Sequence, residues 1–297
     1  MTERTVIRDD VTLVCHDRGG DGPPLLLLHG LAGYGGEWNT FARHLGPRFR
    51  VVTVDQRGHG ASTRRPADVS RAAHVADVVA VIEQLDLGPV TLLGQSYGGH
   101  AAMLTAAAHP ELVERLVMVE AGPAAGSAST VADIGAWFAS WPAPFATASA
   151  AVEFLGGGPV GEAWAAGLEE RADGRYPRFD PDVMVAALID NTHRSWWPEW
   201  SRIACPTLVV LAQSTIIDAE QLARMHHDRP DSVLTSIPGT THDLHLERPE
   251  ALVELLEAFC TTGAALRWPG AARTPCGSSP RAATGPPRPR RAGSRSL

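Results

Sequence analysis

The chain has 297 residues, 44% of them hydrophobic, and a formal net charge of −7, which fits a soluble globular fold and excludes a coiled coil, a collagen or a wholly disordered chain. All 26 basic residues are arginine, which excludes lysine-based chemistry such as a Schiff base. Seven of the arginines lie in residues 263–297, so residues 1–262 contain 19 arginines and 33 acidic residues. This excess of negative charge argues against a nucleic-acid partner.

Targeting and membrane signals are missing from the sequence pattern. No early segment pairs basic residues with an apolar stretch, and no apolar run approaches the length of a membrane span. The four cysteines show no zinc-binding spacing. We therefore expect a cytoplasmic protein that binds neither membrane nor metal; the oligomeric state stays open.

Apolar runs alternate with helical patterns from about residue 5 to residue 262. This alternation predicts a mostly parallel sheet with helices on both faces. The expected strands are 11–16, 24–30, 49–55, 89–95, 115–121, 205–212 and 232–238. The expected helices are 38–45, 71–86, 97–108, 219–228 and 248–261.

The rhythm breaks between residues 124 and 204, where helical pieces occur without a convincing strand. We interpret 124–204 as an inserted helical cap, and 1–123 with 205–262 as the core. Residues 263–297 are mostly Ala, Arg, Pro, Gly and Ser, a composition that favours disorder. An arginine-rich tail could bind an acidic partner, but an extension without function is the simpler interpretation.

The strongest chemical signal is Gly94-Gln95-Ser96-Tyr97-Gly98, which follows a predicted buried strand and opens an alanine-rich helix. Gly-x-Ser-x-Gly in this context is a nucleophile elbow, a tight turn that raises a serine hydroxyl above the sheet edge. A glycine-rich loop begins at His29-Gly30-Leu31. The backbone N–H groups of Leu31 and Tyr97 would form an oxyanion hole.

A serine hydroxyl needs a general base, and histidine is the usual one. His242 lies in a loop between the last predicted strand and the last helix, where such a base is expected. His245 is the nearest rival, and we interpret it as a packing or pocket residue. A metal site built on the two histidines is disfavoured because no carboxylate pattern accompanies them.

Together these segments resemble the α/β-hydrolase fold superfamily over about residues 5–262. The segments that carry the resemblance are LLLLHGLAGYGGEW, VVTVDQRGHGAS, LLGQSYGGHAA, LVMVEAGP, CPTLVVLAQS and GTTHDLHLERPE. The resemblance implies an eight-stranded sheet with a cap after the sixth strand, and a Ser–acid–His triad. It assigns Ser96 as nucleophile, His242 as base, and Leu31 and Tyr97 as oxyanion donors. The loop that begins at Asp55 is structural in most members.

The triad acid is where this sequence departs from the superfamily. Members usually carry an Asp just after the strand that matches residues 205–212, and here that turn contains none. Glu120, at the end of the sixth strand, is the favoured candidate, because some members keep their acid there. Asp218 precedes a helix and is better suited to an N-cap. A Ser–His dyad without either acid is the third possibility.

Residues 124–204 hold six of the eight tryptophans, which would form the core of the cap, with one or two of them facing substrate. The sequence thus predicts a cofactor-free serine hydrolase that cleaves a carboxylic ester of an apolar small molecule. C–C bond hydrolysis, a thioester or lactone substrate, acyl transfer, a lyase or a cofactor-free oxygenase are alternatives on the same fold. A small-molecule-binding protein without activity is the alternative of another class. Dehalogenase and epoxide hydrolase chemistry is disfavoured, because related members use Asp as nucleophile.

Overall fold

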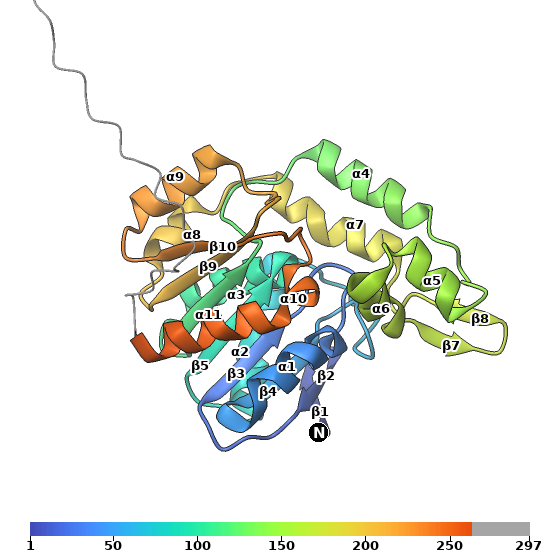
Figure 1. Cartoon of the computed structure of the whole chain (residues 1–297), viewed down its shortest axis with the longest axis horizontal. Coiled ribbons are helices and arrows are strands. Elements are labelled where there is room, and N and C mark those ends of the chain that lie inside the picture. The colour runs from blue at the N-terminus through green and yellow to red at the C-terminus, as the bar shows by residue number, and fades with distance from the viewer. Residues whose placement is uncertain (263–297) are drawn as a thin grey trace, which may run out of the picture.

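The computed structural model describes residues 1–262, so the expectations for the 263–297 tail lie outside the described residues. Its centre is an eight-stranded, mostly parallel sheet with the strand order β1-β2-β4-β3-β5-β6-β9-β10 (Figure 1). The β1–β2 and β2–β4 pairs are antiparallel, and the remaining pairs are parallel. This sheet with flanking helices confirms the predicted fold class. The strand bounds are Thr2–Arg8, Val11–Asp17, Arg50–Asp55, Pro24–Leu28, Val90–Gln95, Val113–Val119, Thr207–Ala212 and Val233–Ile237, in that spatial order.

Helices cover both faces of the sheet because alternate strand residues point to opposite sides. In β3, Leu26 and Leu28 pack into one apolar cluster, while Leu25 and Leu27 pack into the other. The first face is covered by α2 (Arg71–Gln84), α3 (Ser96–Ala108) and α8 (Trp197–Arg202), with α9 (Ala219–Asp228) packed at its edge. The second face is covered by α1 (Asn39–Leu45) and α11 (Pro249–Thr262).

Two elements near the sheet, a strand and a short helix, were not predicted from the sequence. Strand β1 was not predicted, because only Val6 within it is buried and an exposed edge strand has no apolar run to reveal it. The predicted helix 38–45 is confirmed as α1, and a 3₁₀ turn, Gly35–Trp38, comes directly before it. A short helix, α10 (Leu244–Glu247), was also missed, since it lies inside a segment treated as a loop.

The chain between the end of β6 and the start of β9 forms a group of helices that lies apart from the sheet (Figure 1). It consists of α4 (Ala128–Ala139), α5 (Ala148–Phe154), α6 (Gly158–Ala166) and α7 (Pro181–Ile189). The expectation that this stretch holds no strand was wrong: β7 (Glu169–Arg171) and β8 (Gly174–Tyr176) form an antiparallel hairpin. Strands of three residues are too short to show an alternating pattern in the sequence.

The six tryptophans of this stretch do not form one core. Trp141 belongs to an apolar cluster with Phe138, Phe145 and Phe179, and Trp164 packs against it. Another three tryptophans pack instead against the sheet cluster that contains α3, and these are Trp196, Trp197 and Trp200. The prediction of a single cap core was therefore wrong for this second group. Spacing along the chain cannot show which of two neighbouring apolar clusters a tryptophan joins.

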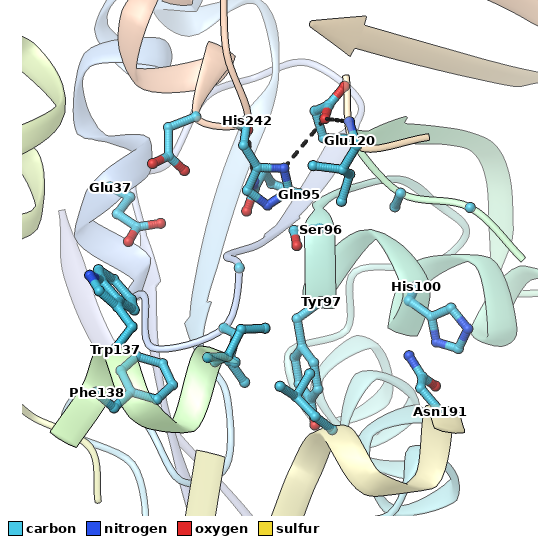
Figure 2. Close-up of a pocket in the computed structure, with 18 of the residues that line it drawn as sticks. Glu37, Gln95, Ser96, Tyr97, His100, Glu120, Trp137, Phe138, Asn191 and His242 are labelled. Atoms are coloured by element: carbon cyan, nitrogen blue, oxygen red, sulfur yellow. Dashed lines mark hydrogen bonds and ion pairs between the residues drawn. The ribbon is translucent and has the colours of Figure 1, made fainter. Parts of the chain in front are cut away.

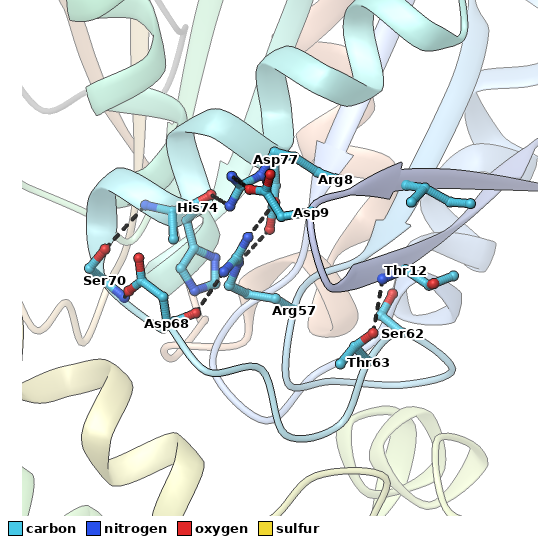
Figure 3. A network of polar contacts seen from close by, with 12 residues as sticks. Arg8, Asp9, Thr12, Arg57, Ser62, Thr63, Asp68, Ser70, His74 and Asp77 are labelled. Carbon is cyan, nitrogen blue, oxygen red and sulfur yellow. Dashed lines mark hydrogen bonds and ion pairs between the residues drawn. The ribbon is translucent and has the colours of Figure 1, made fainter.

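A buried ion-pair network fixes the loop after β4 to the helix that follows it (Figure 3). Arg57 and Asp77 form a two-bonded pair with N–O distances of 2.6 and 2.5 Å, and both side chains are buried. Arg8 donates to the same carboxylate at 2.8 Å, and Arg57 also donates to the carbonyl of Asp68 at 2.6 Å. These contacts fix α2, whose first residue is Arg71, relative to the sheet.

Candidate active site

Ser96 occupies a sharp turn between β5 and α3. Its φ of 48° lies in the left-handed region, which is unusual for a residue with a side chain. A Cβ on Gly94 would lie 2.3 Å from the carbonyl oxygen of Gly98, and one on Gly98 would lie 2.4 Å from that of His29. Only glycine allows the backbone to approach so closely at these two positions. The geometry matches the predicted nucleophile elbow.

A cavity of about 350 Å³ opens at the carboxyl edge of the parallel strands (Figure 2). The residues predicted for the triad and the oxyanion hole all line it: Leu31, Ser96, Tyr97, Glu120 and His242. Segments from four distant parts of the chain thus meet at one place. A cavity of this kind at the carboxyl ends of parallel strands is where α/β folds place their ligands.

Glu120 is the acid that contacts His242. It follows β6 directly, has a φ of 51° and is 0% exposed. Its Oε2 lies 3.3 Å from Nδ1 of His242, and it accepts the N–H groups of Ala212 and Ile216 at 2.7 and 3.2 Å. Burial raises the pKa of Glu120, but the hydrogen bonds from His242 and the two N–H groups outweigh it and leave the pKa below its ordinary value. The carboxylate is therefore ionised at neutral pH.

Asp218 serves a different purpose. It is the N-cap of α9, where its Oδ1 accepts the N–H of Gln221 at 2.8 Å. It is exposed and does not line the cavity. Of the two candidate acids, the structure brings Glu120 and not Asp218 to the imidazole.

His242 lies in the loop between β10 and α10, with its side chain 37% exposed. The Nε2 of Gln95 donates to its carbonyl at 3.1 Å, which ties this loop to the residue before Ser96. Figure 2 shows the imidazole and Ser96 next to each other in the cavity. Within residues 1–262 no hydrogen bond joins the two side chains, and such bonds are often long without substrate.

Hydrogen bonds of His29 fix the start of the loop that carries Leu31. The Nε2 of His29 accepts the main-chain N–H of Gln56 at 3.0 Å, and Gln56 Nε2 donates to the His29 carbonyl at 2.6 Å. Burial lowers the pKa of His29 to about 4, so the ring stays neutral and can accept. Asp55, at the end of β4, accepts the N–H groups of Gly35 and Ala61 at 2.6 and 2.8 Å. This agrees with the structural role expected for its loop.

His245 is a packing residue. It is 2% exposed, and its ring lies 4.8 Å from that of Trp38. Its Nε2 is 3.6 Å from the carboxylate of Glu37, which is also buried and lines the cavity. Burial and the nearby charge of Asp243 raise the pKa of Glu37 well above its ordinary value. Within the part of the chain that the structure describes, no group of three or more His, Cys, Asp or Glu residues could hold a metal ion.

The remaining lining residues include some that the sequence predicted and some that it missed. Trp137 and Trp164 agree with the expectation that one or two tryptophans face the cavity. The polar residues that sequence reasoning missed are Glu37, Arg71, His100, Asn191 and Asp243. They belong to no recognised motif, and only the packing of the helices brings them together. His100 was findable in principle, because it lies four residues after Ser96 on the same helix.

Comparison with known proteins places this site in context. The sequence profile described as "alpha/beta hydrolase fold" matches residues 23–249. The zebrafish (Danio rerio) sn-1-specific diacylglycerol lipase ABHD11 is 38% identical over 129 residues, which are 43% of this chain and only 40% of that protein. Its mouse (Mus musculus) counterpart is 28% identical over 255 residues, which are 80% of each chain. The crystal structure of E-2-(acetamidomethylene)succinate hydrolase superposes with a TM-score of 0.80 at 23% identity, covering 88% of this chain and 99% of that one.

Within residues 1–262, no helix is both long and apolar enough to cross a membrane. The profile match spans more than half of the chain, and the sheet order and the elbow agree with it. The chain belongs to the α/β-hydrolase fold family.

Proposed function

We propose that this protein is a serine hydrolase that cleaves a carboxylic ester by way of an acyl-enzyme. The observation that carries the proposal is the 3.3 Å contact between Glu120 and His242 in the cavity that Ser96 also lines. Nucleophile, base and orienting acid are thus assembled at one place. None of the proposed steps requires a cofactor.

In the first half-reaction, Ser96 Oγ attacks the ester carbonyl carbon while His242 Nε2 accepts the hydroxyl proton. Glu120 holds Nδ1 in its protonated form, which leaves Nε2 free to accept, and it stabilises the imidazolium that results. The backbone N–H groups of Leu31 and Tyr97 would hold the oxyanion. The intermediate then collapses, the carbon–oxygen bond to the alcohol breaks, and His242 returns the proton to the alkoxide.

In the second half-reaction, a water molecule replaces the alcohol. His242 removes a proton from the water as its oxygen attacks the acyl carbon, and the second tetrahedral intermediate expels Ser96 Oγ, which recovers its proton from His242. The products are an acid and an alcohol, and the protein returns to its starting protonation state.

The cavity wall favours an apolar substrate. Apolar and aromatic side chains make up much of it, among them Ile134, Trp137, Phe138, Trp164, Leu188 and Ile216. Such a lining favours alkyl or aryl groups over a sugar. The mouse relative carries the name of a lipase that acts on diacylglycerol, which supports an ester as the bond cleaved.

The first experiment measures hydrolysis of p-nitrophenyl butyrate by the wild type and by Ser96→Ala. We expect turnover by the wild type and a loss of at least about a thousandfold in kcat for the variant. A fluorophosphonate probe should label the wild type and leave Ser96→Ala unlabelled. A wild type that neither hydrolyses the ester nor reacts with the probe would overturn the proposal in favour of a binding protein. Labelling without ester hydrolysis would point to another acyl chemistry on the same serine.

A further inference from the structure

A buried arginine with no acidic partner lies on the wall of the cavity. Arg71, the first residue of α2, is 1% exposed and lines the same cavity as Ser96. Its Nε donates to Oδ1 of Asn191 at 3.1 Å, and its Nη1 donates to the carbonyl of Tyr97 at 3.4 Å. The guanidinium carbon also lies 3.8 Å from the centroid of the Tyr97 ring. The two acceptors and the ring are all neutral.

Within residues 1–262, no carboxylate lies within ion-pair distance of this guanidinium. The closest acid by contact is Asp190, whose Oδ2 accepts the main-chain N–H of Arg71 at 2.9 Å and not the side chain. Arg57 is buried to the same degree but has Asp77 at 2.5 Å. Burial without an ion pair is costly, and it lowers the pKa of Arg71. The charge of Asp190 offsets part of this effect without forming an ion pair. A buried cation that faces a cavity without a direct ion pair can be balanced by an anion from the ligand.

His100 provides a second and independent observation. It is 4% exposed, lines the cavity, and neither of its ring nitrogens has a hydrogen-bond partner among the described residues. Its ring packs edge-on against Trp196 at 5.3 Å. Burial, reinforced by the positive charge of Arg71 and Arg194, lowers its pKa well below the ordinary value. The ring is therefore neutral and carries one N–H that has no acceptor.

The polar residues of the cavity wall lie on different sides of Ser96. Figure 2 shows Glu37 on one side of Ser96 and His100 with Asn191 on the other. Asp243, which accepts from Trp164 Nε1 at 3.3 Å, and Glu120 are the other two carboxylates of the lining. Arg71 is the single arginine of the cavity wall within residues 1–262, so an anionic group of a ligand would be attracted to it.

We propose that Arg71, His100 and Asn191 form a subsite for a carboxylate carried by the ester substrate. This inference rests on the proposed function and specifies its substrate as an apolar ester with one anionic end. A planar guanidinium suits a carboxylate, and a single buried arginine balances one negative charge, which favours a carboxylate over a doubly charged phosphate. His100 lies one helical turn from Ser96, on the order of 6 Å, so only a few bonds would separate the carboxylate from the scissile carbonyl.

The test uses ester pairs that differ only by a carboxylate in place of a methyl group. Monoethyl adipate is compared with ethyl hexanoate, which tests the acyl side, and O-butanoylglycolate with ethyl butanoate, which tests the alcohol side. The readout is the ratio of kcat/KM within each pair. We expect the wild type to prefer the anionic ester in at least one pair.

Arg71→Gln should lower that ratio by about 10- to 100-fold, the range for a lost hydrogen bond to a charged group. His100→Leu retains the arginine and should lower the ratio several-fold. Arg65→Gln is the matched control, because it removes the same charge from a side chain that is 59% exposed and paired with Asp180 and Asp182. Its ratio should match the wild type.

A ratio that stays at the wild-type value in both Arg71→Gln and His100→Leu would overturn the subsite. The ratio is internal to each variant, so a partly unfolded variant does not distort it. If Arg71→Gln does not fold, Arg71→Lys replaces it; we expect a lower ratio for Lys, because an ammonium lacks the two-pronged geometry.

A binding measurement separates this proposal from the proposed function. Hexanoate should raise the unfolding temperature of Ser96→Ala, and hexanol at the same concentration should raise it less. The double variant Ser96→Ala/Arg71→Gln should lose the difference. Stabilisation by hexanoate in a protein that cleaves none of the esters would retain the subsite and refute the hydrolase. Ester cleavage without any preference for the anionic ester would retain the hydrolase and refute the subsite.

Discussion

The identity of the triad acid can be tested by replacing the Glu120 carboxylate with an amide of the same shape. Glu120 accepts the N–H of Ala212 at 2.7 Å, the N–H of Ile216 at 3.2 Å and Nδ1 of His242 at 3.3 Å. The side chain of Thr215 also forms a hydrogen bond with this carboxylate. A glutamine can keep its oxygen on Ala212. Its NH₂ group then faces both Ile216 and His242.

The consequence for catalysis follows from the tautomer of the imidazole. An amide N–H donates to Nδ1, so the ring proton moves to Nε2, the atom that must accept the proton of Ser96. In triads of this type, such a change lowers kcat by about 10⁴. We expect Glu120→Gln to lower kcat for p-nitrophenyl butyrate by about 10³ to 10⁴. The donor left unpaired at Ile216 should reduce the free energy of unfolding by about 1–3 kcal/mol.

The assay is steady-state hydrolysis of p-nitrophenyl butyrate at neutral pH, with unfolding in urea as the check on folding. Asp218→Asn is the matched control, because it makes the same chemical change at the exposed N-cap of α9. Its kcat should remain near the wild-type value. The reasoning is refuted if folded Glu120→Gln retains more than about a tenth of wild-type kcat. A loss confined to Asp218→Asn would transfer the acid role to that residue.

Three further predictions concern stability. Asp77→Asn leaves Arg57 buried without its acidic partner, so the free energy of unfolding should fall by about 3 kcal/mol. Urea denaturation measures this change, and a loss below about 1 kcal/mol would contradict the buried pair. Gly98→Ala places a Cβ 2.7 Å from the Leu28 carbonyl oxygen, so we expect a loss of about 3 kcal/mol together with a loss of esterase activity, and a stable, active variant would disprove the close approach. The free energy of unfolding should decrease as the pH is lowered from about 6.5 to about 4, because the unfolded chain protonates histidines that the folded protein keeps neutral. Urea unfolding measured from about pH 7.5 to about pH 4 tests this, and a constant free energy across the range would contradict the prediction. The histidines whose pKa burial lowers are His29 to about 4, His59 to about 3, His245 to about 4, and His74 and His100 well below the ordinary value.

Local sequence was enough for the features that depend on neighbouring residues. Buried strands show as continuous apolar runs, and the turn at Ser96 needs glycines at fixed spacing, so the central sheet and the elbow were predictable. The N-cap role of Asp218 was predictable for the same reason, since a cap bonds to an N–H three residues further on. The missed strands, β1, β7 and β8, are the ones that are exposed or too short to show a pattern.

The features decided by tertiary structure join residues far apart in the chain. Glu120 and His242 are 122 positions apart, and the sequence supplied both as candidates without showing that they touch. The division of the tryptophans between two apolar clusters depends on how the helices pack. The buried charge of Arg71 is the clearest case, because an arginine at the start of a helix gives no sign in the sequence of being buried. Only the packing of α2, α3 and the residues after α7 around one cavity determines that this side chain is buried without an ion pair. Desolvation is a property of the surroundings in space, which is why sequence spacing alone could not reveal it.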